Sequence, residues 1–436
     1  MRRYKEQPLA DATMLPYIVL KNGSKYFDRI CFLNSNSYKH DPYSSFDWLI
    51  ALGAYKEFKT SDDNVFDSLK RFADQTNDWI FGYLSYDVKN QIEKLSSSNF
   101  DNINFDLTQF FQPEILIICR DSKINLGLLI NNDKWNKHEN VWSLLTRPVA
   151  PVDEKHNIVD IQPRVEKSLY ISNVKKIKEH IQRGDIYEMN YCVEFFGENA
   201  LIDPLQTYLN LNKLSPAPFS AYYKFGDKYL LSSSPERFIK KTGDKIISQP
   251  IKGTIKRGNS KKSDERLKEQ LYHDPKERSE NVMIVDLVRN DLAKTALKGS
   301  VKVEELFGIY SFAHVNHMIS TIASRISPKR HYIDAIKEAF PMGSMTGAPK
   351  VRAMEIIEQF ESTKRGLYSG CIGYINADKD FDFNVVIRSI LFDQTKRYVN
   401  FLVGGAITSG SEPEEEYDEC LLKAKAMKKV LNEDNL

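Results

Sequence analysis

The sequence has no long apolar run, almost no net charge and few cysteines, and each of these shortages excludes a class of protein. No stretch approaches the roughly 18 uninterrupted apolar residues that a membrane-spanning helix requires, so we expect a soluble globular protein. Lys and Arg number 61 against 59 Asp and Glu, which leaves none of the basic excess that attracts proteins to nucleic acid or anionic lipid. The length of 436 residues allows two or three domains.

The cysteines are isolated from one another, and none has the CxxC spacing of a zinc site or a redox dithiol. They are Cys31, Cys119, Cys192, Cys371 and Cys420. The basic start Met1-Arg2-Arg3 is not followed by the apolar segment of a secretory signal. We therefore expect reduced thiols and a cytoplasmic protein.

Short apolar runs separated by polar turns predict a strand-rich N-terminal region, residues 1–150. Three of these runs are predicted as strands: Tyr17 to Leu20, Trp79 to Leu84 and Ile115 to Cys119. Residues 94–104, rich in Ser and Asn, are predicted as a surface loop, and the proline-containing residues 147–164 as a linker to the second part.

Helices and strands alternate through that second part, residues 165–432. Apolar residues at helical spacing predict a helix over 168–183 that ends at Gly184. A strand over 189–196 follows, and residues 219–225 and 229–232 form a predicted hairpin with its turn at Gly226-Asp227. This mixture favours an α/β or α+β fold over a helical bundle.

A predicted helix beginning at Asp274-Pro275 carries the glutamates Glu277 and Glu280. Glu280 shares a face with apolar residues in the hydrophobic segment 282–288, so we expect this segment to be buried and the charge to need a partner. For Glu277, a role in a capping box is an equally good interpretation.

A second predicted helix, near the end of the sequence, carries Glu416, Glu419 and Lys423 on one side, and Ser411 is in position to cap it. Pairs of glutamates from two helices suit Mg²⁺, which prefers hard oxygen ligands and takes one or two protein carboxylates. The alternative for this helix is a solvated acidic start that the helix dipole favours.

Residues 340–350 form a turn-rich loop that leads into a predicted helix over 351–360. Loop amides at a helix N-terminus bind anions, and the GxxxxGK[ST] spacing of a phosphate loop is absent, so a carboxylate is the better ligand. Arg388, placed at the end of an apolar strand, suits a bidentate carboxylate contact or a structural ion pair. Gly404-Gly405 permits close approach to a ligand or marks a bulge.

Five segments together resemble the chorismate-utilising enzymes, in the same order along the chain. They are Ser234-Pro235-Glu236, Pro250 to Thr254, Glu280 to Leu292, Gly347 to Lys350 and Ser411 to Glu419. The resemblance covers residues 168–430; in the first 150 residues it is weak and depends mainly on Phe81 to Asp87. It implies an α+β (mixed α/β) fold in which large antiparallel sheets pack as a sandwich with helices outside.

The resemblance also implies a role for each candidate residue. Glu280 and Glu419 would bind Mg²⁺ directly, Glu277 and Glu416 through water, and the metal would hold the ring carboxylate of chorismate. Glu236 would be the general acid at the 4-hydroxyl, and His317, which by itself would be taken for a core histidine, would lie beside the ring. The rest of the chorismate site would be lined by Thr346, Gly347, Tyr368, Arg388, Gly405 and Lys423.

Two positions predict which reaction is catalysed. Glu188 occupies the place of the lysine base with which isochorismate and salicylate synthases activate water, so hydroxylation is disfavoured; the amine-using members commonly have glutamine there. Lys252 replaces the alanine of anthranilate synthases and matches the lysine of aminodeoxychorismate synthases. We therefore predict amination of chorismate at C4 to 4-amino-4-deoxychorismate, a precursor of 4-aminobenzoate and folate. Anthranilate synthase component I and a catalytically silent chorismate-binding protein stay open as alternatives.

The predicted mechanism makes Lys252 a nucleophile, although composition alone would place any one of so many lysines at the surface. We expect burial and the neighbouring site to lower its pKa, so that it attacks C2 while Glu236 protonates the departing hydroxyl. Ammonia then attacks C4 and expels the lysine. The family takes ammonia from a glutamine amidotransferase, which we expect to be a separate subunit because Leu436 follows the catalytic motifs closely and no nucleophile-elbow cysteine occurs.

Overall fold

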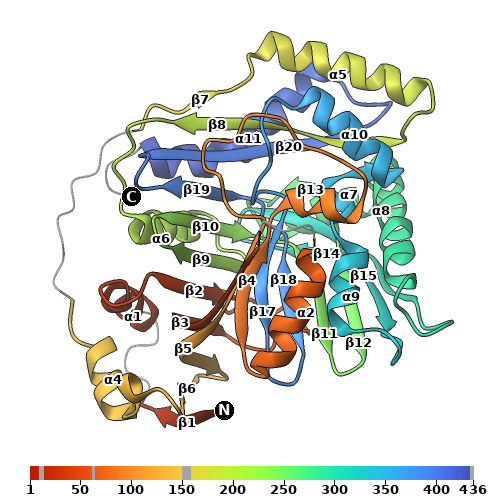
Figure 1. Cartoon of the computed structure of the whole chain (residues 1–436). Helices are drawn as coiled ribbons and strands as arrows, with labels where there is room; N and C mark the ends of the chain where they lie inside the picture. Colours follow the sequence, from red (N-terminus) through yellow and green to blue (C-terminus); the bar gives the residue numbers. More distant parts are fainter. Residues whose placement is uncertain (9–13, 61–63, 150–158, 433–436) are drawn as a thin grey trace.

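Two large antiparallel sheets form the centre of the structure, and helices lie on their outer faces (Figure 1). The structure is a computed structural model, and it describes residues 1–8, 14–60, 64–149 and 159–432. Much of the predicted linker over 147–164 therefore lies outside the described residues. Within them, no helix is long and apolar enough to cross a membrane.

The first sheet contains the longest strands. Its order is β1 (Arg2–Gln7), β6 (Lys123–Leu129), β5 (Thr108–Arg120), β3 (Trp48–Thr60), β2 (Arg29–Asn34), β9 (Phe219–Phe225), β10 (Lys228–Ser234), β19 (Ser389–Asp393), β20 (Tyr398–Ile407) and β8 (Glu188–Gly197). The short strands β7 (Gln162–Pro163) and β16 (Gly347–Ala348) pair with β8. The register places Ala348 opposite Glu188, so the glycine loop is attached to the strand that carries this glutamate.

The second sheet branches from the first at β5, whose early residues pair with β4 while its later residues pair with β6. Its order is β4 (Ile80–Leu84), β17 (Cys371–Ile375), β18 (Phe381–Asn384), β11 (Arg237–Thr242), β12 (Lys245–Gln249) and β15 (Val315–Arg325), with β13 (Ile251–Lys256) and β14 (Lys302–Ser311) also paired to β15. Strands from residues 1–150 thus pair with strands of the second part in both sheets. The division into two domains stays a prediction.

The inner faces of the two sheets share one apolar core. Tyr83 of β4 and Tyr223 of β9 are fully buried and meet edge to face, with ring centroids 5.7 Å apart. Burying an apolar side chain of this kind stabilises a fold by about 1.5–3 kcal/mol, and alternation along each strand sends the other residues to the outer faces. The predicted sandwich of antiparallel sheets is confirmed.

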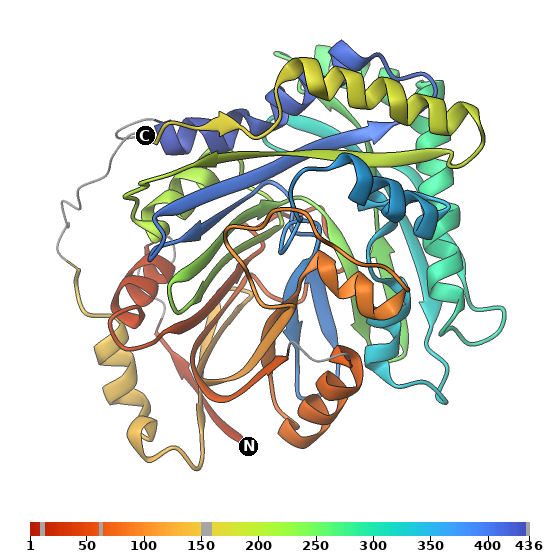
Figure 2. The ribbon, with the colours of Figure 1, turned by 45° about the horizontal axis from the view of Figure 1, so that its top comes forward.

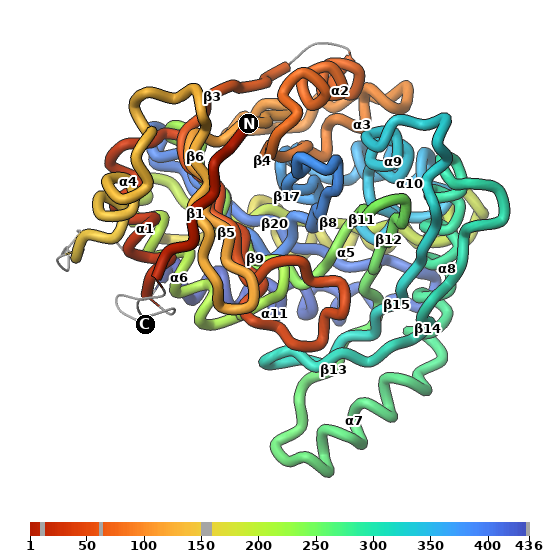
Figure 3. The backbone as a smooth tube through the Cα atoms, turned by 90° about the horizontal axis from the view of Figure 1, so that it is seen from below, coloured from red at the N-terminus to blue at the C-terminus, as the bar shows by residue number. Residues whose placement is uncertain are grey.

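Helices cover both outer faces. Over the first sheet lie α1 (Leu15–Gly23), α4 (His138–Leu145), α5 (Lys167–Gln182), α6 (Pro204–Leu214), α10 (Lys350–Phe360) and α11 (Pro413–Asn432). Figure 2 shows α5 and α11 lying along the long strands β8 and β20. Over the second sheet lie α2 (Val65–Thr76), α8 (Pro275–Ala293) and α9 (Tyr332–Ala339). The helix α7 (Lys261–His273) protrudes from the body (Figure 3).

Most of the predicted elements are present, but one predicted strand is wrong. Residues Tyr17 to Leu20 belong to the helix α1, which has Pro16 in its first turn and buries Leu15, Val19 and Leu20. A run of four apolar residues has no periodicity that separates a strand from a buried helix, and proline in the first turn favours the helix. The other two predicted strands, the helix ending before Gly184 and the hairpin at Gly226 are confirmed.

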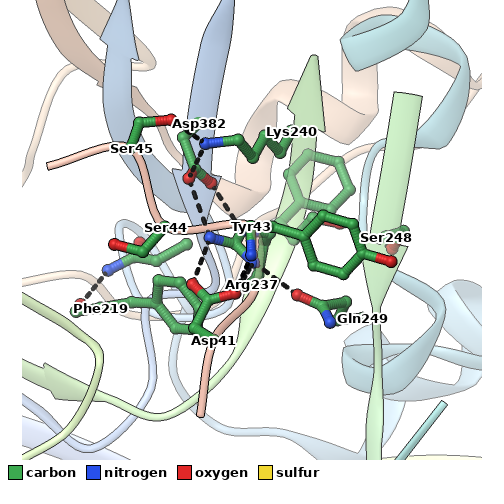
Figure 4. A network of polar contacts seen from close by, with 12 residues as sticks. Asp41, Tyr43, Ser44, Ser45, Phe219, Arg237, Lys240, Ser248, Gln249 and Asp382 are labelled. Atoms are coloured by element: carbon green, nitrogen blue, oxygen red, sulfur yellow. Dashed lines mark hydrogen bonds and ion pairs between the residues drawn. The ribbon is translucent and has the colours of Figure 1, made fainter. Parts of the chain in front are cut away.

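A buried arginine network holds the loop at residues 35–47 against the second sheet (Figure 4). Arg237 of β11 pairs with Asp41 of the loop at 2.8 Å and with Asp382 of β18 at 2.9 Å. Lys240 adds a second contact to Asp382 at 3.2 Å and donates to Ser45. Every charge in this network has a partner, as buried charges require.

Candidate active site

Lys252 lies on β13 with 9% of its surface exposed, and its ammonium faces three carboxylates. The nearest is Glu188 of β8, whose Oε1 lies 3.5 Å from Lys252 Nζ. Burial lowers the pKa of Lys252, but Glu188, Glu280 and Glu236 together raise it by more, so the net pKa is raised. The predicted lowering of this pKa is wrong. The resting lysine is an ammonium, which must lose a proton before it can attack an electrophile.

Glu236 occupies the corner between β10 and β11, where only 4% of it is exposed. Burial raises its pKa to about 7, against the opposing effects of a hydrogen bond from Ser344, the Lys252 charge and the backbone amide of Ile251. The Ser344 hydroxyl donates to Glu236 Oε1 at 2.6 Å. A carboxyl group with this pKa is protonated for much of the time at neutral pH, as a general acid must be.

His317 lies on β15 beside the Lys252 strand. Its Nδ1 is 2.8 Å from Thr254 Oγ1, and it packs edge to face on Phe312 with ring centroids 4.9 Å apart. Burial and the charges of Arg388 and Lys423 together lower the pKa of His317 to about 3, against a hydrogen bond to the Gly253 backbone that raises it. His317 is therefore a neutral imidazole at neutral pH.

Arg388 lies in the irregular segment between β18 and β19 and not in a strand, so its predicted position at a strand end is wrong. Its φ is +52°, a conformation that costs free energy for a residue with a side chain. Burial lowers its pKa, and Tyr368 and Glu419 raise it. Its guanidinium forms no ion pair with any residue that the structure describes. A strained, unpaired cation of this kind suits an anionic ligand.

The four candidate metal ligands come from two helices. Glu277 and Glu280 lie on α8, and Glu416 and Glu419 lie on α11. Burial is the main cause of a raised pKa at Glu277, Glu280 and Glu416, and the pKa of Glu280 is raised to about 7. Repulsion from Glu419 contributes to the raised pKa of Glu277 and of Glu416. The coupling of Glu277 with Glu419 places the first turn of α8 near the carboxylates of α11.

Glu419 differs from the other three because it forms an ion pair. Burial raises its pKa, but Lys423, 2.6 Å away, together with Lys276 and Lys252, lowers it by more. Lys423 also donates to the Gly404 carbonyl at 2.9 Å. No cluster of three His, Cys, Asp or Glu side chains in the described ranges has the spacing of a metal centre. The mutual repulsion still fits a cation such as Mg²⁺, which needs one or two protein carboxylates and completes its shell with water and ligand.

The α8 helix is less buried than its sequence suggests. Val282 is 42% exposed and Asp286 lies in solvent, while Ile284, Val285 and Val288 form the buried face. The prediction that residues 282–288 are buried all round is wrong, because the helix packs on one sheet face only. The predicted cap at Asp274 is present: its carboxylate accepts from the amides of Lys276 and Glu277 at 2.9 and 3.1 Å.

Two glycines allow close contacts inside the site. Gly347 has φ +151°, and a Cβ there would lie 2.2 Å from the backbone oxygen of Glu188. A Cβ at Gly405 would lie 3.1 Å from Glu416 Oε2 and 3.9 Å from Lys423 Nζ. Because glycine has no Cβ, the Glu188 backbone can pack against Gly347 and the Glu416 carboxylate can pack against Gly405.

The remaining predicted residues are buried beside these groups. Thr346 is fully buried, and its hydroxyl donates to the Met342 carbonyl at 3.2 Å. The Tyr368 hydroxyl lies 3.7 Å from Cys192 Sγ. The predicted cap at Ser411 is wrong: α11 begins at Pro413, two residues later, and the Ser411 hydroxyl instead accepts from the Thr408 amide at 3.1 Å and bonds to the Glu416 side chain.

Sequence reasoning missed two supporting residues. Ser344 lies in the glycine loop, but nothing in the loop pattern shows that its hydroxyl reaches Glu236. Arg365 is fully buried, pairs with Glu361 at 2.7 Å and donates to the carbonyls of Met345 and Asn190. Its i,i+4 spacing from Glu361 was the available signal. Arg365 thereby fixes the glycine loop relative to β8.

Comparison with known proteins identifies the family. A family model described as chorismate binding enzyme matches residues 20–429. The protein therefore belongs to the chorismate binding enzymes, and the predicted family is confirmed.

Individual relatives are similar to this chain over different shares of their length. A probable aminodeoxychorismate synthase from rice is 43% identical over 274 residues, which are 62% of this chain and 30% of the rice protein. Aminodeoxychorismate synthase component 1 of Bacillus subtilis is 33% identical over 80% of this chain and 76% of its own length. The crystal structure of anthranilate synthase component I from Streptococcus pneumoniae superimposes with a TM-score of 0.77 at 26% identity, covering 87% of this chain and 91% of that one.

Proposed function

We propose that this enzyme aminates chorismate at C4 to give 4-amino-4-deoxychorismate, an intermediate on the route to 4-aminobenzoate and folate. The observation that carries the proposal is a buried lysine, Lys252, in the same cluster as an acid, Glu236, whose pKa is about 7. A lysine at this position suits covalent catalysis, because a side-chain amine divides one difficult substitution into two. Two relatives named aminodeoxychorismate synthase support the same reaction.

In the proposed reaction Lys252 attacks C2 of chorismate while Glu236 gives its proton to the departing 4-hydroxyl. Ammonia then attacks C4 and expels the lysine. Arg388 is the unpaired cation that suits a carboxylate of the substrate. His317, neutral and hydrogen-bonded to Thr254, orients the ring, and Gly347 and Gly405 line the same site. Thr346, Tyr368 and Lys423 complete the proposed substrate site.

We also propose a Mg²⁺ ion, with Glu280 and Glu419 as ligands and with Glu277 and Glu416 acting through water. When bound, the ion would offset the charge of the substrate's ring carboxylate. The raised pKa values of Glu277, Glu280 and Glu416 support this: burial is the main cause and repulsion between carboxylates adds to it, and a nearby cation would stabilise the charged forms. The ammonia would come from a separate glutamine amidotransferase. Five buried free thiols support a reducing, cytoplasmic location.

Anthranilate synthesis is the second candidate, favoured by the similarity to the anthranilate synthase component I of Streptococcus pneumoniae. The deciding experiment supplies purified protein with chorismate, MgCl₂ and ammonium salt, and identifies the product by mass and chromatography. We expect 4-amino-4-deoxychorismate. Fluorescent anthranilate, formed without an added lyase, would reject the proposal. Chorismate binding by calorimetry with no turnover would indicate a silent binding protein.

A further inference from the structure

Glu188 has one carboxylate oxygen that the fold leaves unused. Only 1% of the residue is exposed. Its Oε1 lies 3.5 Å from Lys252 Nζ, but its Oε2 is buried and has no hydrogen-bond partner among the described residues. An unpartnered buried oxygen costs stability, so its retention calls for a function.

A second glutamate on the same strand shows what a structural carboxylate looks like. Glu194 is also 1% exposed. Its oxygens accept from Arg164 at 2.9 Å, from Tyr398 at 2.8 Å, from Asn400 at 2.7 Å and from Thr363 at 3.1 Å. Glu194 is saturated with donors, whereas Glu188 has only the lysine. The strand β8 therefore carries one glutamate whose two oxygens both have donors and one, Glu188, whose Oε2 has none among the described residues.

We propose that Glu188 is the catalytic base that takes the proton from the Lys252 ammonium and so generates the nucleophilic amine. The inference depends on the proposed C4 amination. The charged groups that face Lys252 come from three places: Glu188 on β8, Glu280 on α8 and Glu236 at the β10–β11 corner. Glu236 accepts from Ser344 and serves the departing hydroxyl, and Glu280 belongs to the proposed metal site. Glu188 is the carboxylate left for the lysine.

The protons balance over a full cycle. The ammonium proton moves from Lys252 to Glu188. Lys252 Nζ then bonds to C2, and the ring double bonds shift from C1=C2 and C5=C6 to C1=C6 and C4=C5. The C4–O bond breaks at the same time, and Glu236 gives the departing hydroxyl the proton that makes it water. Ammonia then bonds to C4, the double bonds return, and the C2–N bond breaks. Lys252 leaves as a neutral amine and takes its proton back from Glu188, and the C4 ammonium returns one to Glu236. The sum is chorismate plus ammonia giving 4-amino-4-deoxychorismate plus water.

The substitution Glu188→Gln separates a base from a mere charge partner, because the two roles predict opposite signs. Removing the carboxylate removes one of the groups that raise the pKa of Lys252, so a charge partner predicts a kcat equal to or above that of the wild type. A base predicts a kcat lower by about 10²-fold to 10⁴-fold at pH 7.5, with KM for chorismate within about threefold. A kcat at or above that of the wild type would overturn the proposal.

Two further readouts exclude a structural effect. In Glu188→Gln, hydroxide replaces the base, so we expect the rate to rise about tenfold per pH unit below pH 7, where Glu236 is still protonated. In Glu188→Ala, added formate should restore activity in proportion to its concentration. Glu194→Gln is the matched control, for which we expect a lower Tm but an unchanged pH profile. A loss in Glu188→Gln with a pH profile that is flat below pH 7, or no rescue by formate, would overturn the assignment.

The wild-type product assay keeps the two proposals apart. If the wild type makes no C4-aminated product, the proposed function fails and the role of Glu188 fails with it. If the wild type makes that product while Glu188→Gln matches its rate, only the role of Glu188 fails.

Discussion

The molecule contains two clusters of buried charge that are built in opposite ways. Around Arg237 each charge meets an opposite one: the guanidinium lies between Asp41 and Asp382, and Lys240 completes the set (Figure 4). Around Lys252 the charges do not balance. One ammonium faces three carboxylates, and Arg388, also in the candidate site, pairs with no described residue.

The two clusters adjoin along the chain, because Glu236 and Arg237 are neighbours in sequence. They differ in whether their charges are paired. A saturated network stabilises the fold and has no affinity left for a ligand. An unbalanced cluster costs stability and gains it back when a ligand of the missing charge binds. The difference indicates that the Lys252 cluster, and not the Arg237 cluster, is the reactive part of the molecule.

The largest expected effect comes from removing the amine of the unbalanced cluster. Lys252→Ala should lower the rate of C4 amination by about 10³-fold or more, because the nucleophile is lost, and some anthranilate should form as ammonia attacks C2 directly. Lys256→Ala, on an exposed position of the same strand, should keep full activity. Intact mass spectrometry of the wild type in single turnover should detect the covalent adduct; normal activity of Lys252→Ala without any adduct in the wild type would refute the nucleophile.

The next effect should appear in stability and not in chemistry. Arg237→Met leaves Asp41 and Asp382 buried without their cation, which should lower the free energy of unfolding by about 3–5 kcal/mol. The matched control is Arg325→Met, whose partner Asp244 lies 3.4 Å away with both side chains mostly exposed, so that about 0–1 kcal/mol is expected. Urea titrations of the three proteins test this. Equal midpoints for Arg237→Met and Arg325→Met would show that the network does not stabilise the fold.

A smaller effect is expected on activation by MgCl₂. Glu280→Gln should weaken activation by MgCl₂ by about 100-fold or more, since it removes a proposed ligand. Glu269→Gln, on the protruding helix α7 and exposed, should leave the activation curve unchanged. Calorimetric titration of MgCl₂ into the chorismate-saturated proteins gives a readout besides turnover. An activation curve of Glu280→Gln identical to that of the wild type would remove Glu280 from the ligand set.

The contrast between the clusters also separates what the sequence predicts from what it does not. The strands follow from short apolar runs, the sandwich follows from the resemblance to the chorismate-utilising enzymes, and the family motifs mark Lys252, Glu236 and Glu280 individually. The sequence does not predict whether the pKa of Lys252 is raised or lowered. The direction depends on carboxylates from β8, α8 and the β10–β11 corner, which only folding brings together. Arg388 was placed in a strand because its neighbours are apolar, and no local pattern reveals its φ of +52°.

The smallest expected effect concerns the pKa of Glu236, the proposed acid of the Lys252 cluster. The Ser344 hydroxyl donates to Glu236 and so stabilises its charged form, which lowers its pKa toward the value of about 7. Ser344→Ala removes this donor, so the pKa of Glu236 should rise, by at most about one to two units for a hydrogen bond of about 1.5–3 kcal/mol to a charged group. A general acid acts in its protonated form, and its activity falls as pH rises through its pKa.

The alkaline limb of the pH–kcat profile should therefore move to higher pH in Ser344→Ala, while kcat near pH 6 changes little. Folding stability provides an independent check with its own sign. Because the pKa of Glu236 is raised above the value of about 4.3 in the unfolded chain, its contribution favours the folded state at acid pH and is lost as pH rises from about 4.5 to about 7. In Ser344→Ala this loss should continue to higher pH. A limb that stays in place, or moves to lower pH, would mean that another group controls the profile and that Glu236 is not the acid.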